Sequence, residues 1–171
     1  MAKEIEANDH VLECACGTGA ISVCVAPVCQ QLVATDFSEP MLEQTKKKCR
    51  HLDNVIVQKA DITSLPYPDA TFDKVIAGNV IHLVKDPYAV LDELLRVCKP
   101  NGKVIIPTYI QKKEGKSSFL VKLLETSGAG FERRFDETTY PAFFQQAGFT
   151  DVSIDVIQGK MPCAIAIITK P

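Results

Sequence analysis

The chain alternates between two spacings of apolar residues. Five short, nearly continuous apolar runs are typical of buried strands, at residues 10–14, 31–36, 54–61, 72–79 and 103–110. Elsewhere apolar residues recur every three or four positions, which predicts helices at about 18–25, 38–50 and 86–98. This alternation predicts a mostly parallel sheet with helices on both faces.

The last third of the chain breaks this alternation. A helix predicted at about 137–147 is followed by Gly148, and two apolar runs, 150–157 and 163–170, then come with five residues between them. Five residues cannot form a parallel crossover, so these strands are expected to form an antiparallel hairpin. We expect an α/β fold, a doubly wound and mostly parallel sheet with a C-terminal antiparallel hairpin, as a single domain over residues 1–171.

Four residues are expected to mark where these elements begin or end. Pro27 is expected to end or kink the first helix. Ser38 is predicted to be an N-cap, with Pro40 in the first helical turn. Pro107, within the fifth apolar run, predicts an interruption or the end of that strand.

Composition narrows the classes of function. The formal net charge of −2 gives no general attraction to nucleic acid or to anionic lipid. No run approaches the roughly 18 apolar residues of a membrane span, and the first ten residues are polar and acidic, unlike a targeting segment. The seven cysteines include no C-x-x-C pair, so we expect reduced, mostly buried thiols and no metal site. These features favour a cytoplasmic protein.

The candidate site is the turn "ECACGTG" at residues 13–19, which joins the first predicted strand to the first helix. Ligands of open α/β sheets bind at the carboxyl ends of the strands, where this turn lies. Gly17 and Gly19 allow a ligand to approach the backbone closely, although glycines can also serve a tight turn alone.

Three acids are expected to lie beside this turn. Glu13, Asp36 and Asp61 end the first three predicted strands, no lysine or arginine accompanies them, and the phosphate-binding pattern G-x-x-x-x-G-K-[ST] is absent. An acid at the end of the second strand suits the two hydroxyls of a ribose. The pattern therefore predicts a site for a nucleoside that carries a positive charge and no phosphate.

Four ordered blocks carry a resemblance to a known family. "VLECACGTGAIS", "VATDFSEPML", "ADITSLPYPDATFDKVIAGNVIHLV" and "LDELLRVCKPNGKVII", between about residues 11 and 106, resemble class I (Rossmann-type) S-adenosylmethionine-dependent methyltransferases. The most similar group is the ubiquinone/menaquinone-type small-molecule methyltransferases. The resemblance implies strand order 3-2-1-4-5-7-6, S-adenosyl-L-methionine as cofactor, and methyl transfer to a small-molecule acceptor by in-line displacement.

The resemblance also implies roles for individual residues. The methionine part of the cofactor would lie near Gly17, Gly19, Glu13 and Asn79. The ribose hydroxyls would contact Asp36. The adenine would lie beside Phe37 and Met41, with its amino group at Asp61 and its ring against Ile62. This chain departs from the family at two positions, where aspartate usually stands at Glu13 and glycine at Ala15. The Ala15 methyl is expected to crowd the cofactor or to sit at a φ that alanine disfavours, and so to weaken binding.

A smaller set of residues is expected on the side of the site that binds the methyl acceptor. His82, just past the fourth strand, is a candidate catalytic base, although packing or capping of the next helix is the more common role for such a histidine. Residues 108–135 are a candidate substrate-covering insertion, with an amphipathic helix that contains Phe119, Leu120, Leu123 and Leu124. Tyr109 and Phe131 are candidate acceptor contacts, and Arg133 and Arg134 would meet an acidic substrate or nothing.

The sequence leaves two alternative functions open, and it also indicates a partner. The chain has only about ten residues before the first strand, where relatives commonly have covering helices, so a homodimer or a partner is expected to cover an open N-terminal edge. The first alternative is a non-catalytic cofactor-binding relative or a methyltransferase subunit. The second is a nicotinamide-dependent oxidoreductase, which the glycine spacing and Glu13 disfavour.

Overall fold

The elements follow the predicted order in a computed structural model, which describes residues 2–111 and 133–171. In chain order they are η1 (Ala2–Glu4), β1 (His10–Cys14), α1 (Ser22–Val25), η2 (Ala26–Val28), β2 (Gln31–Asp36), α2 (Glu39–Cys49), β3 (Val55–Lys59), β4 (Phe72–Ala77), α3 (Pro87–Val97), β5 (Cys98–Tyr109), α5 (Thr139–Gln146), β6 (Val152–Ile157) and β7 (Cys163–Thr169). The described strands therefore match the seven predicted apolar runs.

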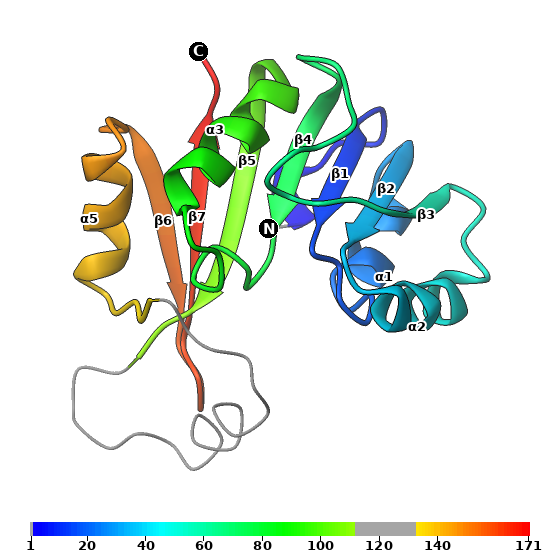
Figure 1. The fold of residues 1–171 in the computed structure, drawn as a ribbon, viewed down its shortest axis with the longest axis horizontal. Coiled ribbons are helices and arrows are strands. Elements are labelled where there is room, and N and C mark those ends of the chain that lie inside the picture. The colour runs from blue at the N-terminus through cyan, green and yellow to red at the C-terminus, as the bar shows by residue number, and fades with distance from the viewer. Residues whose placement is uncertain (1, 112–132) are drawn as a thin grey trace.

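These strands form one sheet in the order β3-β2-β1-β4-β5-β7-β6, as predicted (Figure 1). Strands β1 to β5 are parallel to their neighbours, whereas β7 is antiparallel to both β5 and β6. The predicted hairpin is confirmed, and β7 lies between β5 and the edge strand β6. Because β1 to β5 run the same way, their carboxyl ends meet at one edge of the sheet.

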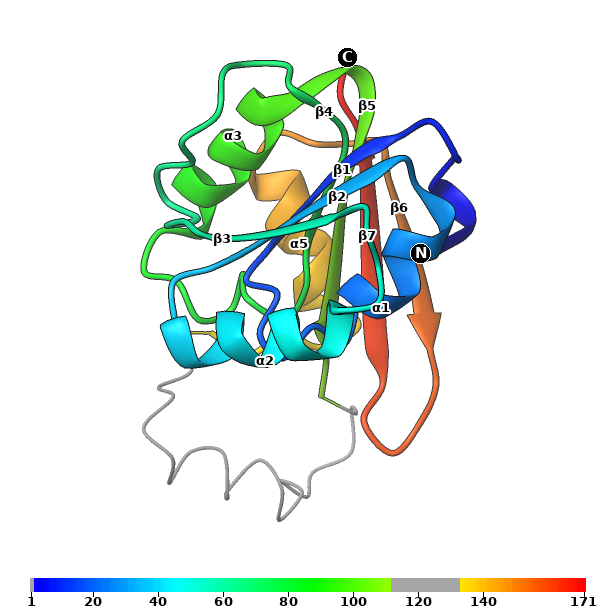
Figure 2. The same ribbon diagram turned by 90° about the vertical axis from the view of Figure 1, so that its right-hand side faces the viewer.

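Helices cover both faces of the sheet, as the alternating pattern predicts. Figure 2 shows α3 and α5 on one side and α1 on the other. One core cluster joins α3 and α5 to residues such as Leu12 and Val104, and a second joins Leu42 of α2 to Val11 and Ile105. Neighbouring residues of one strand thus point into opposite cores, which explains why the central strands are apolar throughout.

The first helix is shorter than predicted. The sequence pattern placed its start at about Thr18, but α1 begins only at Ser22. Gly19 has φ +73°, which a right-handed helix cannot contain, so the preceding residues form turns. Pro27 then lies in η2, where the helix tightens, as expected from its position.

The predicted boundaries of α2 and α3 are close to the observed ones. Asp86 caps α3, because its Oδ1 accepts hydrogen bonds from the amides of Tyr88 (3.1 Å) and Ala89 (3.0 Å). Ser38 occupies the N-cap position of α2, but its side chain makes no capping hydrogen bond. Instead its amide donates to Oδ1 of Asp36 at 2.8 Å.

Pro107 does not interrupt β5, contrary to expectation. The strand continues to Tyr109 and pairs with β7 through Pro107 and Ile165. On the other side, β4 has already ended at Ala77, and the carbonyl of Pro107 accepts the amide of Asn79 at 2.7 Å. The missing proline N–H therefore falls where the parallel ladder has stopped.

Among the described residues, no helix combines the length and the apolar character that a membrane crossing requires.

Candidate functional site

The turn after β1 holds the backbone in an unusual conformation. Ala15, Gly17 and Gly19 have φ of +54°, +55° and +73°. Glycine adopts such angles freely, whereas the Cβ of alanine makes them unfavourable by about 1–2 kcal/mol. The expectation that Ala15 sits at a φ that alanine disfavours is therefore confirmed.

The two glycines serve different purposes. A Cβ on Gly19 would lie 3.0–3.2 Å from atoms of Thr45 in α2, so this glycine permits close packing of the turn against that helix. A Cβ on Gly17 would meet no atom within 4 Å. The backbone of Gly17 therefore borders open space, which is what close approach of a ligand requires.

Side chains from β2 and α2 hold the turn from two sides. The amide of Gly17 donates to Oδ2 of Asp36 at 2.8 Å. Its carbonyl accepts from Oγ1 of the fully buried Thr45 at 2.9 Å. With Oδ1 of Asp36 on the amide of Ser38, this carboxylate joins the turn to the start of α2. Each oxygen keeps a further lone pair that can accept a ligand hydroxyl.

Glu13 lies beneath the turn rather than on an exposed rim. It is only 1% exposed, and its Oε2 accepts a hydrogen bond from Ser22 Oγ of α1 at 2.6 Å. Burial raises the pKa of Glu13 to about 7, and the nearby charge of Asp36 acts in the same direction, while the Ser22 hydrogen bond opposes them. Its contact with Ser22 supports the start of α1.

Asp61 follows β3 and is exposed. Its Oδ1 accepts from the amide (2.9 Å) and the hydroxyl (2.7 Å) of Thr63, and these hydrogen bonds lower its pKa. Ile62 is partly buried against the core that α3 covers. The amide of Ala60 donates to the carbonyl of Asp36 at 3.2 Å, so the ends of β2 and β3 are joined here.

Phe37 and Met41 differ in exposure. Phe37 is 69% exposed, whereas Met41 is partly buried. One basic residue lies near this edge of the sheet: Nζ of Lys59, at the end of β3, is 5.4 Å from the centre of the Phe37 ring. Lys59 is also paired with Glu39 at 3.3 Å, so its charge is already balanced.

Asn79 lies at the carboxyl end of β4. Its φ is +54°, and its Oδ1 accepts the amide of Tyr109 at 3.0 Å. Together with the bond from its own amide to Pro107, this contact ties the end of β4 to that of β5. Its carboxamide NH₂ group remains the part that can donate to a ligand.

His82 follows β4 and is 9% exposed. Burial lowers its pKa, so the imidazole is neutral at pH 7. Its carbonyl accepts the amide of Arg133 at 3.2 Å, and Nη1 of Arg133 lies 3.3 and 3.4 Å from the carbonyls of Val84 and Lys85. The side chain of Arg133 therefore holds the segment before α3.

The candidate insertion at 108–135 is described only at its two ends. Thr108 and Tyr109 belong to β5, Gln111 pairs with Asp136 in an isolated bridge, and Phe135 is buried in the core. The predicted helix with Phe119, Leu120, Leu123 and Leu124, and Phe131, lie outside the described residues.

The seven cysteines form no disulfide bond, and five of them are buried. Burial raises the pKa of both Cys14 and Cys16, beside the turn, to about 12, so each is a neutral thiol at pH 7. Within the described ranges, no group of three or more His, Cys, Asp or Glu side chains could hold a metal ion.

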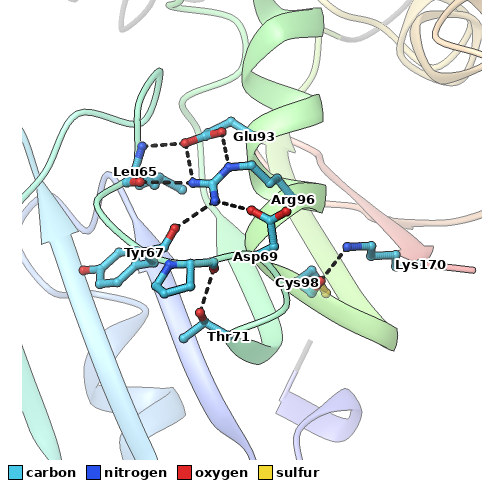
Figure 3. A network of polar contacts seen from close by, with 9 residues as sticks. Leu65, Tyr67, Asp69, Thr71, Glu93, Arg96, Cys98 and Lys170 are labelled. Atoms are coloured by element: carbon cyan, nitrogen blue, oxygen red, sulfur yellow. Dashed lines mark hydrogen bonds and ion pairs between the residues drawn. The ribbon is translucent and has the colours of Figure 1, made fainter.

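Sequence reasoning missed the residues that support the site. Ser22 and Thr45 hold the turn, and Arg96 of α3 holds the segment after Asp61 (Figure 3). Each of these residues is separated along the chain from the group that it contacts, and none belongs to a sequence motif that would have indicated the contact. Two surface hollows, between α2 and β3 and over β5 to β7, contain none of the predicted site residues.

The residues at this edge fit a cationic nucleoside. The turn offers open space above Gly17, and the carboxylate of Asp36 lies beside it with lone pairs to spare. Phe37 adds an exposed aromatic face at the end of β2. Fold and site together define a doubly wound α/β protein whose strand ends suit a nucleoside-type ligand.

Comparison with known proteins identifies the family. Residues 12–106 match the family described as "Methyltransferase domain". A demethylmenaquinone methyltransferase of Clavibacter sepedonicus is 33% identical over 165 residues, which span 85% of this chain and 67% of the relative. The chain therefore belongs to the methyltransferase family.

Solved structures support the same fold. A SAM-dependent methyltransferase from Aquifex aeolicus is similar with a TM-score of 0.71 and 22% identity, over 95% of this chain and 82% of that one. A candidate methyltransferase from Bacillus halodurans C-125 is similar with a TM-score of 0.76 and 15% identity, over 98% of this chain and 94% of that one.

These findings confirm several predictions. The chain is an S-adenosylmethionine-dependent methyltransferase of class I, its cofactor is S-adenosyl-L-methionine, and it transfers a methyl group to a small-molecule acceptor. The oxidoreductase alternative finds no support in them. The roles of individual site residues and the covering function of 108–135 stay predictions.

Proposed function

We propose that this enzyme methylates a quinone-type small molecule. The observation that carries the proposal is the 33% identity over 165 residues with a demethylmenaquinone methyltransferase. A second relative of the same description, from Halalkalibacterium halodurans, is 30% identical over 180 residues, 91% of this chain and 73% of that one. An acceptor of this class is an apolar ring system, which needs an apolar wall beside the transferred methyl group.

The cofactor is held, in this proposal, by residues of the first four strand ends. Gly17 and Gly19 bring the backbone close to its methionine part, with Glu13 beneath them and Ala15 beside them. Asp36 accepts hydrogen bonds from the ribose hydroxyls, and Asp61 accepts one from the adenine amino group. The adenine ring lies between Phe37, Met41 and Ile62. S-adenosylmethionine supplies an electrophilic methyl group on a positively charged sulfur, and the protein supplies orientation and exclusion of water.

The acceptor side of the proposal rests on exposed apolar side chains near Asn79. Leu83, after β4, is 39% exposed, and Tyr109, at the end of β5, is 51% exposed. The amide of Tyr109 is bonded to Asn79, so the two strand ends hold a fixed relation. His82 in its neutral form is the candidate to accept the proton that a methylated ring carbon or oxygen must lose.

The proposal also covers the cellular compartment of the enzyme and its partners. Seven free thiols support a reducing compartment, and hence the cytoplasm. The net charge of −2 supports a small-molecule acceptor rather than nucleic acid. A homodimer or partner at the edge beside the N-terminal residues, and a covering role for 108–135, complete the proposal.

The test is formation of S-adenosylhomocysteine with a short-chain demethylmenaquinone reduced to its quinol, against catechol and histamine as other acceptors. We expect turnover with the quinol only, and loss of turnover in Asp36→Asn together with weaker binding of S-adenosylmethionine. Turnover of catechol or histamine but not of the quinol would contradict a quinone-type acceptor.

A further inference from the structure

The segment between β3 and β4 has no helix of its own, yet it carries two of the proposed cofactor contacts, Asp61 and Ile62. It runs from Ala60 to Thr71 and consists of turns and one isolated bridge, Asp61 with Ser64. A loop of this kind needs contacts from elsewhere to hold one position. In this protein those contacts come from the C-terminal half of α3.

Arg96 makes most of these contacts (Figure 3). Its Nη1 donates to the carbonyl of Tyr67 and to Asp69 Oδ1, both at 2.8 Å, and its Nη2 donates to the carbonyl of Leu65 at 3.1 Å. Its own carbonyl accepts the amide of Ala70 at 2.9 Å. One residue thus contacts four positions of the segment.

Glu93, one turn earlier on α3, completes the arrangement. Its two carboxylate oxygens accept from Nε (2.8 Å) and Nη2 (2.9 Å) of Arg96, which fixes the plane of the guanidinium. The same carboxylate accepts the amide of Leu65 at 2.6 Å. Both polar groups of the Leu65 backbone are therefore bonded to the Glu93–Arg96 pair.

These contacts also restrict the position of Asp61 and Ile62, the residues of the segment that contact the cofactor in our proposal. Leu65 is 5% exposed and Ile62 packs on the same core, so the segment is anchored three residues beyond Ile62. At its other end the amide of Ala60 is bonded to the carbonyl of Asp36. Asp61 and Ile62 thus lie between two fixed points, one of which is the Glu93–Arg96 pair.

From this arrangement we propose that Arg96 and Glu93 are positioning residues for the cofactor: they hold Asp61 and Ile62 at the adenine. The inference rests on the proposed placement of the adenine at these two residues. It assigns α3 a part in cofactor affinity although neither Arg96 nor Glu93 touches the cofactor.

The experiment compares the whole chain with Arg96→Lys and Glu93→Gln. Lysine keeps the charge but replaces the planar fork with a single ammonium group, so it cannot reach several carbonyls at once. Glu43→Gln is the matched control, because Glu43 forms the same i,i+3 pair with Lys46 on α2 (2.8 Å) away from this segment. Calorimetry gives the Kd for S-adenosylhomocysteine, and hydrogen exchange of the protein without ligand gives the protection of residues 62–67.

We expect Arg96→Lys to raise the Kd about tenfold, because the ligand must then order a segment that the protein no longer holds in place. Exchange at Leu65 and Tyr67 should quicken in both variants and stay unchanged in Glu43→Gln. In turnover assays the KM for S-adenosylmethionine should rise while kcat does not fall.

Two other outcomes would overturn the inference, and they are distinguishable. If the wild-type protein binds the ligand and Arg96→Lys binds it equally well while losing thermal stability, the pair is only structural. If the wild-type protein itself does not bind S-adenosylhomocysteine, the proposed cofactor site fails and the inference fails with it.

Discussion

At the scale of single residues, the site contains a strained alanine. Ala15 has φ +54° in the turn that binds the cofactor in our proposal, and Ala70 has φ +52° in the segment before β4. The turn accepts this strain because its neighbour Gly17 is held by partly buried hydrogen bonds from Thr45 and to Asp36.

Ala15→Gly should therefore stabilise the protein. Relief of about 1–2 kcal/mol of strain is partly offset by the greater freedom of glycine in the unfolded chain, so we expect a net gain of about 0.5–1 kcal/mol in urea unfolding. Removal of the methyl should also lower the Kd for S-adenosylmethionine. Ala70→Gly is the control, with the same strain relief and no gain in affinity; equal affinity changes in both variants would contradict a specific effect at the turn.

Glu13 should make stability depend on pH. Its pKa is raised from 4.5 to about 7, so the folded protein binds more protons than the unfolded chain between these values. Its favourable contribution is therefore complete below pH 4.5 and is lost as the pH rises to about 7. Glu13→Gln should remove this loss, which amounts to up to about 3 kcal/mol in the free energy of unfolding.

The matched control for Glu13 is Glu43→Gln. Lys46 lowers the pKa of Glu43, so its contribution is present above the unfolded pKa and is lost as the pH falls, the opposite direction. Urea unfolding across this pH range measures both. Parallel pH curves for the wild-type protein and Glu13→Gln would show that the buried carboxyl does not titrate as described.

At the scale of elements, helix α2 shapes the turn that precedes α1. Thr45 is fully buried, donates to the carbonyl of Gly17, and occupies the space that a side chain at Gly19 would need. The packing of α2 against α1 and β2 is thus linked to the conformation of the candidate site.

Thr45→Val should test this link with little change of shape. Loss of the hydroxyl leaves a carbonyl unbonded, which costs about 1 kcal/mol, and we expect the Kd for S-adenosylhomocysteine to rise about fivefold. Thr35→Val removes a similar bond, to the carbonyl of Glu13 at 3.1 Å, from within the sheet. Calorimetry should show the larger loss of affinity in Thr45→Val; the reverse order would place the control of the turn in β2.

At the scale of the whole molecule, the site draws on widely separated parts of the chain. The turn after β1, the ends of β2, β3 and β4, and the supporting helices α2 and α3 meet only in the folded state. A ligand that binds the folded state alone must therefore stabilise the entire domain.

S-adenosylhomocysteine at one hundred times its Kd should add about 2.7 kcal/mol to the free energy of unfolding and raise the Tm. Differential scanning calorimetry measures the shift. NADH serves as the control ligand, because the fold can accept a ribose of either cofactor but the acids of this site disfavour a pyrophosphate. A comparable shift with NADH would contradict the assignment.

The sequence alone determined the order of elements, the sheet with its reversed β7, and the cofactor class. The strands could be predicted because a buried strand requires a run of apolar residues that are adjacent in the sequence. The cofactor class could be predicted because the four motif blocks identified the family. The expected start of the first helix was wrong because Gly19 adopts a left-handed conformation, in a turn that packs closely on Thr45 of α2.

Only the tertiary structure decided how the candidate site is supported. It placed Glu13 beneath the turn with Ser22, brought Lys59 over Phe37, and joined Arg96 to Leu65, 31 residues earlier in the chain. Such contacts depend on which side chains meet across elements, and no local spacing of apolar or polar residues encodes them. The strand ends could be read from the sequence, whereas the groups that hold them follow from the packing of helices on the sheet.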